Sequence, residues 1–277
     1  MKHIYVNLKR FDVPREIGGV NDIAPINKWA AYIIEEIRDK VRRYNEKAEF
    51  TFFFPEMHLI NALEARETAG IPKIGCQSVY SEDVKPGENF GTFTTERPAA
   101  AIKALGCDSV LIGHCEERNR FKTIMDEADT EDGNAVNRLL NKEIKNAIWQ
   151  GMEVLYCVGE KSEEQDRWEE VLSKQLDIGL EGVNKEKVVI AYEPIWSIGP
   201  GKVPANKEYI TKIARYIKSS TGNMQVVYGG GLKKENAQML AAIPEIDGGL
   251  IALTRFQGDI GFYPGEYLEI LEEYLGK

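Results

Sequence analysis

The chain has 277 residues, 43% hydrophobic and 29% charged, which suits one large α/β domain as well as two small ones. Its net charge is -9, and its Lys and Arg residues are scattered, which argues against nucleic-acid and anionic-membrane partners. No apolar run approaches membrane-spanning length, and Asn7, Lys9 and Arg10 break the apolar start of the chain. We therefore expect a soluble, cytoplasmic protein.

The cysteines lack the spacing of a metal site. Cys76, Cys107, Cys115 and Cys157 are far apart, and three of them lie in or beside apolar, strand-like runs. We expect reduced thiols, no metal ligands and no cofactor.

Strand-like and helix-like segments alternate along the whole chain. Short aliphatic and β-branched runs predict buried strands, and apolar residues at helical spacing predict the helices that cover them. The expected strands are residues 4–6, 50–54, 74–79, 109–112, 154–158, 188–191, 226–228 and 249–253. The expected helices lie near residues 30–41, 57–70, 98–105, 139–148, 168–176, 206–220, 237–241 and 267–275.

Eight such βα units predict a closed (β/α)8 TIM barrel, an α/β fold in which residues 1–277 form a single domain. An open doubly wound sheet is the alternative. In a barrel, the loops that follow the strands gather at one face, where barrel enzymes carry out their chemistry. Functional residues are therefore expected at the C-terminal ends of the strands.

The sixth strand is followed by a carboxylate and a segment typical of a closing lid. Pro194 and Trp196 stiffen the start of the segment, whereas Gly199 and Gly201 loosen its tip. Glu193, at the mouth of the strand, is a candidate general base, because loss of water under a lid raises the pKa of a carboxylate. An ordinary βα loop with a surface glutamate is the alternative.

Other strand ends also carry polar or glycine-rich segments. Asn7 and Lys9 follow the first strand, Gly113-His114-Cys115-Glu116 the fourth, and Gly229-Gly230-Gly231 the seventh. An amide, a cation, an imidazole and a glycine-rich loop would thus converge on the Glu193 carboxylate.

These segments resemble the triosephosphate isomerase family from the first strand to the last helix. Asn7-Leu8-Lys9 resembles the family's Asn-Trp-Lys, and residues 112–118 resemble its Ile-Gly-His-Ser-Glu-Arg-Arg. Residues 191–202 are similar to its base-and-lid segment, and residues 228–231 to its Tyr-Gly-Gly-Ser. The lid and the His114 segment are the specific motifs, whereas the glycine-rich motif alone is weak.

The resemblance implies a cofactor-free aldose-ketose isomerase that interconverts D-glyceraldehyde 3-phosphate and dihydroxyacetone phosphate through an enediolate. Glu193 would move the proton between adjacent carbons, and a neutral His114 would hydrogen-bond the two oxygens in turn. The family is a well-known example of a glutamate base and a neutral histidine that act under a closing loop. Lys9 and Asn7 would stabilise the developing oxyanion, and Glu116 would pair with Lys9.

Structural or surface roles are the alternatives for the same residues. His114 could be a structural histidine at a strand end, Lys9 a solvated lysine and Glu116 a carboxylate at a helix start. An isomerase of four-carbon ketose phosphates and a non-catalytic sugar-phosphate-binding barrel are the alternative functions. The intact Lys9, His114 and Glu193 set argues against the second, since binding alone requires no base.

The family holds the phosphate largely by backbone N–H groups from three loops, and this chain departs from that plan. Gly199, Gly230 and Gly231 are expected to bind the anion, although Gly231 replaces the family's serine and its hydroxyl donor. After the eighth strand, Ala252 and Leu253 replace a Gly-Gly pair, and their side chains would keep the anion further from the backbone.

Two alternative roles are expected for Arg255, which lies in the same segment. It would compensate by direct bidentate pairing with the phosphate, or it is a surface arginine. The loop between Gln77 and Gly91 is longer than in the family, where it inserts into a neighbouring subunit, so the resemblance also implies a homodimer.

Overall fold

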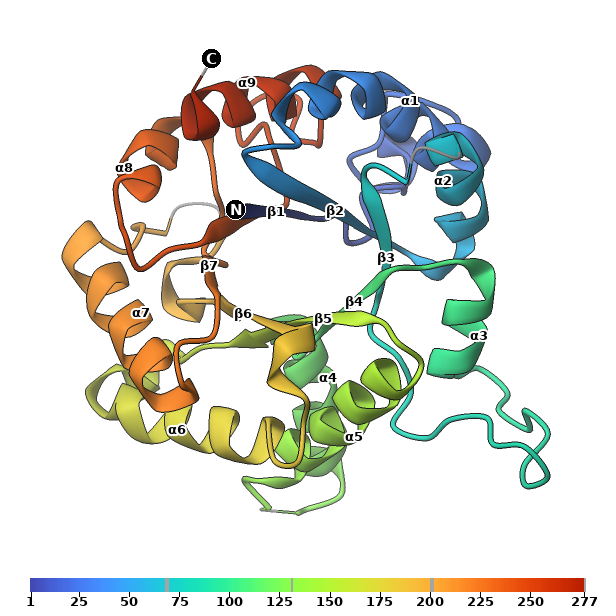
Figure 1. The fold of residues 1–277 in the computed structure, drawn as a ribbon, viewed down its shortest axis with the longest axis vertical. Coiled ribbons are helices and arrows are strands. Elements are labelled where there is room, and N and C mark those ends of the chain that lie inside the picture. Colours follow the sequence, from blue (N-terminus) through green and yellow to red (C-terminus); the bar gives the residue numbers. More distant parts are fainter. Residues whose placement is uncertain (68–69, 131, 200–201, 277) are drawn as a thin grey trace.

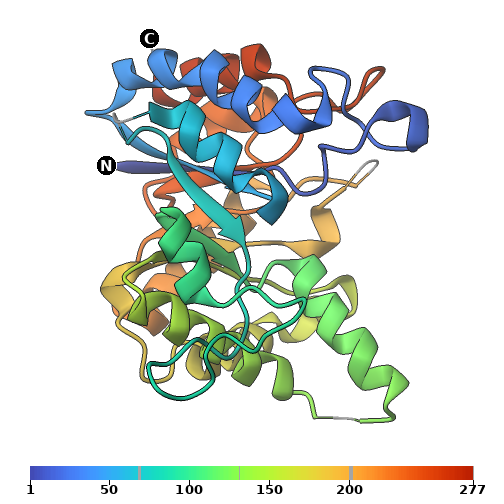
Figure 2. The same cartoon turned by 90° about the vertical axis from the view of Figure 1, so that its right-hand side faces the viewer.

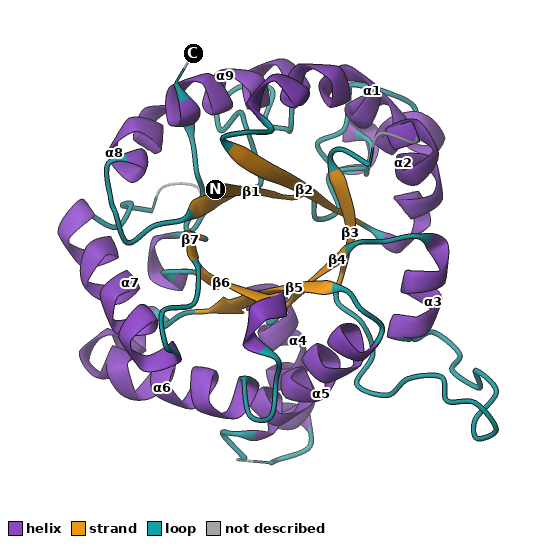
Figure 3. Cartoon of the chain, in the orientation of Figure 1, coloured by secondary structure: helices purple, strands orange, loops and turns teal. Residues whose placement is uncertain are grey.

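The computed structural model describes residues 1–67, 70–130, 132–199 and 202–276, so Pro200 and Gly201 at the expected lid tip lie outside the described residues. Within these ranges, eight parallel strands close into a barrel in sequence order, and helices surround it (Figure 1; Figure 3). The predicted TIM barrel is therefore confirmed, and the open doubly wound sheet is excluded.

The strands alternate between two environments, as the pleat of a strand requires. They are β1 Lys2–Asn7, β2 Ala48–Phe54, β3 Lys73–Gln77, β4 Ser109–Ile112, β5 Glu153–Val158, β6 Val188–Tyr192, β7 Val226–Tyr228 and β8 Gly248–Ile251. One set of side chains forms a separate buried cluster that includes Tyr5, Phe53, Leu155 and Val227. The neighbouring set, including Ile4 and Phe52, belongs to the larger core that contains the buried faces of the helices. The barrel is thus filled with side chains, and its site lies at the mouth.

The surrounding helices carry the predicted apolar faces. They are α1 Trp29–Val41, α2 Leu59–Arg66, α3 Ala99–Leu105, α4 Cys115–Glu127, α5 Ala135–Trp149, α6 Trp168–Gly179, α7 Lys207–Thr221, α8 Ala237–Ala241 and α9 Pro264–Leu275. In α7, for example, Ile210, Ile213 and Ile217 are fully buried, as their helical spacing requires. None of the described helices is both long and apolar enough to cross a membrane.

The C-terminal ends of the strands form the functional face. In Figure 2 β1 runs from left to right, and the loops after β1, β6 and β8 gather with α4 at the right-hand side. The fourth unit has two helices, α4 and α5, where the sequence predicted one. Helix α4 has no buried residue, so it lacks the apolar periodicity that would have revealed it.

The eighth strand is shorter than predicted. It ends at Ile251, so Ala252 and Leu253 belong to the loop that follows. This loop folds back on itself through an antiparallel bridge between Arg255 and Gly261. The segment 252–263, which we call the β8 hairpin, thereby forms one wall of the functional face.

Candidate active site

A cavity of about 280 Å³ opens at the functional face and is lined by loops after five strands. All five predicted catalytic residues line it: Asn7, Lys9, His114, Glu116 and Glu193. Five of the six predicted phosphate-binding residues also line it: Gly199, Gly230, Gly231, Ala252 and Leu253. The structure therefore brings together residues whose separation in the sequence reaches nearly the length of the chain.

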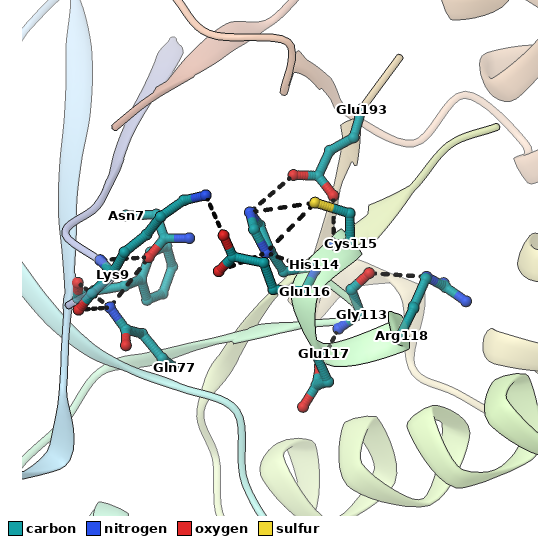
Figure 4. Close-up of polar contacts among 11 residues, drawn as sticks. Asn7, Lys9, Gln77, Gly113, His114, Cys115, Glu116, Glu117, Arg118 and Glu193 are labelled. Carbon is teal, nitrogen blue, oxygen red and sulfur yellow. Dashed lines mark hydrogen bonds and ion pairs between the residues drawn. The ribbon is translucent and has the colours of Figure 1, made fainter. Parts of the chain in front are cut away.

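The carboxylate of Glu193 is buried against the loop after β4. Its side chain is 3% exposed, and its Oε1 lies 3.3 Å from Nε2 of His114 (Figure 4). Its Oε2 accepts a hydrogen bond of 3.1 Å from the backbone N–H of Cys115. The Glu193 N–H donates to Val158 O at 2.8 Å, which fixes the end of β6 against β5. The Glu193 carboxylate is thus held beside the imidazole, with both oxygens engaged.

The tautomer of His114 follows from its local contacts. His114 is the N-cap of α4, and its Nδ1 accepts a hydrogen bond of 3.2 Å from the backbone N–H of Glu116. An accepting Nδ1 carries no proton, so the neutral ring has its proton on Nε2. That N–H faces Glu193 and the cavity, where it can donate to an oxygen of a ligand.

Lys9 and Asn7 are tied to each other and to the loop after β4. The Lys9 ammonium pairs with Glu116 Oε1 at 2.7 Å, and the Lys9 N–H donates to Asn7 Oδ1 at 3.1 Å. Burial raises the pKa of the Glu116 carboxyl, but hydrogen bonding and charge from Lys9 outweigh it and hold that pKa below its ordinary value. Gln77, which the sequence did not single out, donates to Asn7 Oδ1 at 3.1 Å from β3.

Arg118 braces the turn that carries His114. Its Nε donates to Gly113 O at 2.8 Å (Figure 4), and its Nη2 donates to Cys157 O at 3.0 Å. Glu117 Oε2 accepts from the Gly113 N–H at 2.6 Å on the other side of the turn. These contacts join the ends of β4 and β5, so the imidazole projects from a rigid support.

A buried carboxylate anchors the start of the lid segment. Glu160 is fully buried, and its Oε1 accepts from Tyr192 Oη at 2.9 Å, Trp196 Nε1 at 2.8 Å and Tyr209 Oη at 3.0 Å. Burial and the Glu160 charge raise the pKa of both tyrosines above the ordinary value. The sequence reasoning missed Glu160, because a lone glutamate after a strand reads as a surface residue.

Glycine is needed at two positions after β7 because neighbouring atoms leave no room for a side chain. A Cβ on Gly229 would lie 2.8 Å from Cγ of Glu193, and a Cβ on Gly230 would lie 2.3 Å from the Tyr228 hydroxyl. The close approach of this loop to Glu193 is therefore possible only with glycine.

Arg255 is not part of the cavity lining. Its Nε donates to Glu266 Oε1 at 2.8 Å, and its guanidinium lies 3.9 Å from the centre of the Tyr263 ring. Lys233 is instead the cation from this part of the chain that lines the cavity, together with Phe256. Neither residue was singled out from the sequence, where Lys233 reads as a solvated residue before a helix.

The donor atoms of His114, Cys115 and Glu193 lie within 4.8 Å of one another, the spacing of a small metal site. However, burial and the nearby Glu193 charge raise the pKa of the Cys115 thiol to about 12. This thiol is therefore largely protonated near neutral pH.

Comparison with known proteins agrees with this geometry. The sequence model of the triosephosphate isomerase family matches residues 26–260. Triosephosphate isomerase of Dictyoglomus thermophilum is 34% identical over 232 residues, which cover 79% of this chain and 85% of that protein. That of Alkaliphilus metalliredigens is 32% identical over 239 residues, 82% of this chain and 88% of that protein. That of Pelodictyon phaeoclathratiforme is 37% identical over 183 residues, which cover 62% of this chain and 68% of that protein.

Proposed function

The chain belongs to the triosephosphate isomerase family, and we propose that it interconverts D-glyceraldehyde 3-phosphate and dihydroxyacetone phosphate with Glu193 as base and His114 as electrophile. The observation that carries these roles is the 3.3 Å approach of the two side chains inside one cavity. In this proposal residues 1–277 act as one barrel domain, without a cofactor.

Glu193 starts the reaction by removing a proton from the hydroxymethyl carbon of dihydroxyacetone phosphate. The C–H electron pair forms a carbon–carbon double bond, and the carbonyl pair moves onto its oxygen as an enediolate. Nε2–H of His114 and the ammonium of Lys9 stabilise that oxygen, and Asn7 adds an amide donor. A proton passes from the other hydroxyl to the enediolate oxygen through His114. Glu193 then returns its proton to the neighbouring carbon as the aldehyde forms.

Glu193 must change its contacts before it can act. Its Oε1 faces His114 and its Oε2 accepts from the Cys115 N–H, so a substrate carbon needs the carboxylate to turn into the cavity. Ile198 and Gly199 line the same cavity from the lid segment and would cover the substrate when the segment closes. Exclusion of water strengthens the electrostatic contacts and limits loss of phosphate from the enediolate.

Steady-state kinetics test this function directly. We expect wild-type protein to turn over D-glyceraldehyde 3-phosphate faster than a four-carbon ketose phosphate, and Glu193→Gln and His114→Gln to abolish most of that turnover. Glu163→Gln, at an exposed position, is the matched control. Preference for the four-carbon substrate would favour the alternative isomerase that the altered β8 loop suggests. Tight binding of phosphate esters with no turnover of either substrate would indicate a binding protein.

We also propose that the protein works as a homodimer in the cytoplasm. The loop between β3 and α3 extends away from the barrel (Figure 1), and Phe90 within it is 84% exposed. A second cavity of about 290 Å³ lies beside Lys9 and is lined also by Arg97, Glu117 and Arg120. The loop of a second copy would fill this cavity. The four free cysteines, three of them buried, suit a reducing compartment.

Sedimentation analysis tests the dimer. Wild-type protein should sediment at twice the chain mass of 31.2 kDa, and Phe90→Asp should shift it toward the monomer. Ile124→Asp, which changes another exposed apolar side chain on α4, should leave the mass unchanged. A monomeric wild type at micromolar concentration would contradict the proposal.

A further inference from the structure

A second ammonium group, besides that of Lys9, lines the cavity. Lys233 follows the glycine-rich loop after β7 and lines the cavity together with Phe256 of the β8 hairpin. Its Nζ lies 3.8 Å from the centre of the Phe256 ring, which is within cation–π distance. The ring therefore contacts one side of the ammonium.

Lys233 differs from the lysine next to it. Among the described residues no carboxylate forms an ion pair with Lys233, whereas Lys234 pairs with Glu269 of α9 at 2.8 Å. Burial lowers the pKa of Lys233 below its ordinary value, against a smaller opposing effect of the Glu235 charge. Within the described residues, Lys233 is thus a partly buried cation that no ion pair engages, while Lys234 is ion-paired at the surface.

The local backbone holds Lys233 in this place. Asn236 Oδ1 accepts from the Lys233 N–H at 2.8 Å, and Asn236 Nδ2 donates to Gly231 O at 2.9 Å. Gly231 has a φ of 94°, and a Cβ built there would lie 3.5 Å from Cε of Lys233. The side chain of Lys233 therefore passes over the glycine that stands where the family has a serine.

The β8 hairpin holds Phe256 in turn. Arg255 N donates to Gly261 O at 3.1 Å and Gly261 N donates to Arg255 O at 3.2 Å, which fixes the hairpin next to Phe256. Arg15, from the extended loop after β1, pairs with Asp259 at 2.6 Å and donates to Tyr263 Oη at 2.8 Å. Arg15 thereby links the loop after β1 to the β8 hairpin.

We propose that Lys233, seated on Phe256, is the cation that binds the phosphate group of the substrate. A Gly-Gly pair at the positions of Ala252 and Leu253 would let the backbone approach the phosphate closely. Lys233 replaces part of the binding that this backbone contact would supply. One side of the ammonium keeps its contact with the ring while another meets a phosphate oxygen in a charge-assisted contact. The inference rests on the proposed function for the identity of the phosphate ester.

Binding of inorganic phosphate, measured by titration calorimetry on the full chain, tests the assignment. Lys233→Met should weaken phosphate binding and raise KM for D-glyceraldehyde 3-phosphate about 10- to 100-fold, as loss of a charged hydrogen bond does. Lys234→Met should change either value less than about twofold. Lys233→Arg should restore most of the affinity, and Phe256→Leu should give an intermediate loss.

Unphosphorylated D-glyceraldehyde separates a phosphate ligand from a structural residue. Its kcat/KM should be the same in wild type and Lys233→Met, because no phosphate is present. Unchanged phosphate affinity in Lys233→Met, or an equal fall with both substrates, would overturn the assignment. If the wild type bound phosphate through Lys233 but isomerised no triose phosphate, the proposed function would fail and this assignment would stand.

Discussion

The Nε2 atom of His114 lies 3.3 Å from Oε1 of Glu193, although the two residues come from different strands. Since Nδ1 of the same ring accepts the Glu116 N–H, the proton on Nε2 points at the base and into the cavity. The backbone thereby selects the tautomer that can donate to a substrate oxygen. A carboxylate and a hydrogen-bond donor placed in this way suit proton abstraction beside a carbonyl.

Shortening the base should separate catalysis from binding. Glu193→Asp withdraws the carboxylate by one methylene, and a misplacement on the order of 1 Å can cost about 10²-fold in rate. We expect kcat for D-glyceraldehyde 3-phosphate to fall by about that factor while KM changes little, as measured in a coupled assay. Glu163→Asp on the surface serves as the control. Glu193 would lose its assigned role if both variants kept the wild-type turnover number.

The Cys115 thiol should resist alkylation near neutral pH. Burial and the Glu193 charge raise its pKa to about 12, so the thiolate is scarce below that pH. At pH 8 we expect iodoacetamide to modify Cys115 at least roughly 10³-fold more slowly than free cysteine, whose pKa is near 8.5. Mass spectrometry of quenched samples measures the rate.

Glu193→Gln should speed this alkylation at fixed pH, because it removes the nearby negative charge that helps to raise the thiol pKa. Glu163→Gln should not change it. Modification of Cys115 at the rate of free cysteine in wild-type protein would contradict the burial and charge described for this thiol.

Much of the barrel is predictable because its signals are local. The strand predicted at residues 109–112 has the same bounds in the structure, and α3 ends at Leu105, the last residue of the predicted helix, where Gly106 adopts a left-handed conformation. His114 and Glu193 follow their strands directly, so the rule that strand ends share one face brings them together. Helix α4 was missed because no residue in it is buried.

Side-chain direction is the part that sequence reasoning cannot supply. Arg255 and Phe256 are neighbours in the chain, yet the first turns to Glu266 and the second lines the cavity. Lys233 and Lys234 likewise separate into a cavity residue and a surface residue. Glu160 is buried only because three donors from β6, the lid segment and α7 converge on it. Each of these outcomes depends on tertiary packing between distant segments.

Removing one donor to Glu160 should loosen the start of the lid. Trp196→Phe keeps an aromatic ring but deletes the Nε1–H that Glu160 accepts at 2.8 Å. A buried carboxylate that loses a hydrogen bond destabilises the fold by about 1–3 kcal/mol, measured as the free energy of unfolding in urea. We also expect lower kcat and faster release of inorganic phosphate from the substrate, because the lid protects the enediolate.

Trp149→Phe is the matched control, since Trp149 is 85% exposed at the end of α5. It should leave unfolding, kcat and phosphate release unchanged. Equal behaviour of the two tryptophan variants would argue against an anchoring role for Glu160.

Arg255 should act through the β8 hairpin and not through the phosphate. Its guanidinium is engaged with Glu266 and the Tyr263 ring, so Arg255→Met should reduce stability and leave phosphate affinity within about twofold of wild type. A double-mutant cycle with Glu266→Gln isolates the pair. Because both side chains are about a third exposed, we expect a weak coupling in the free energy of unfolding that falls with added salt. A loss of phosphate affinity in Arg255→Met as large as that in Lys233→Met would return Arg255 to the binding site.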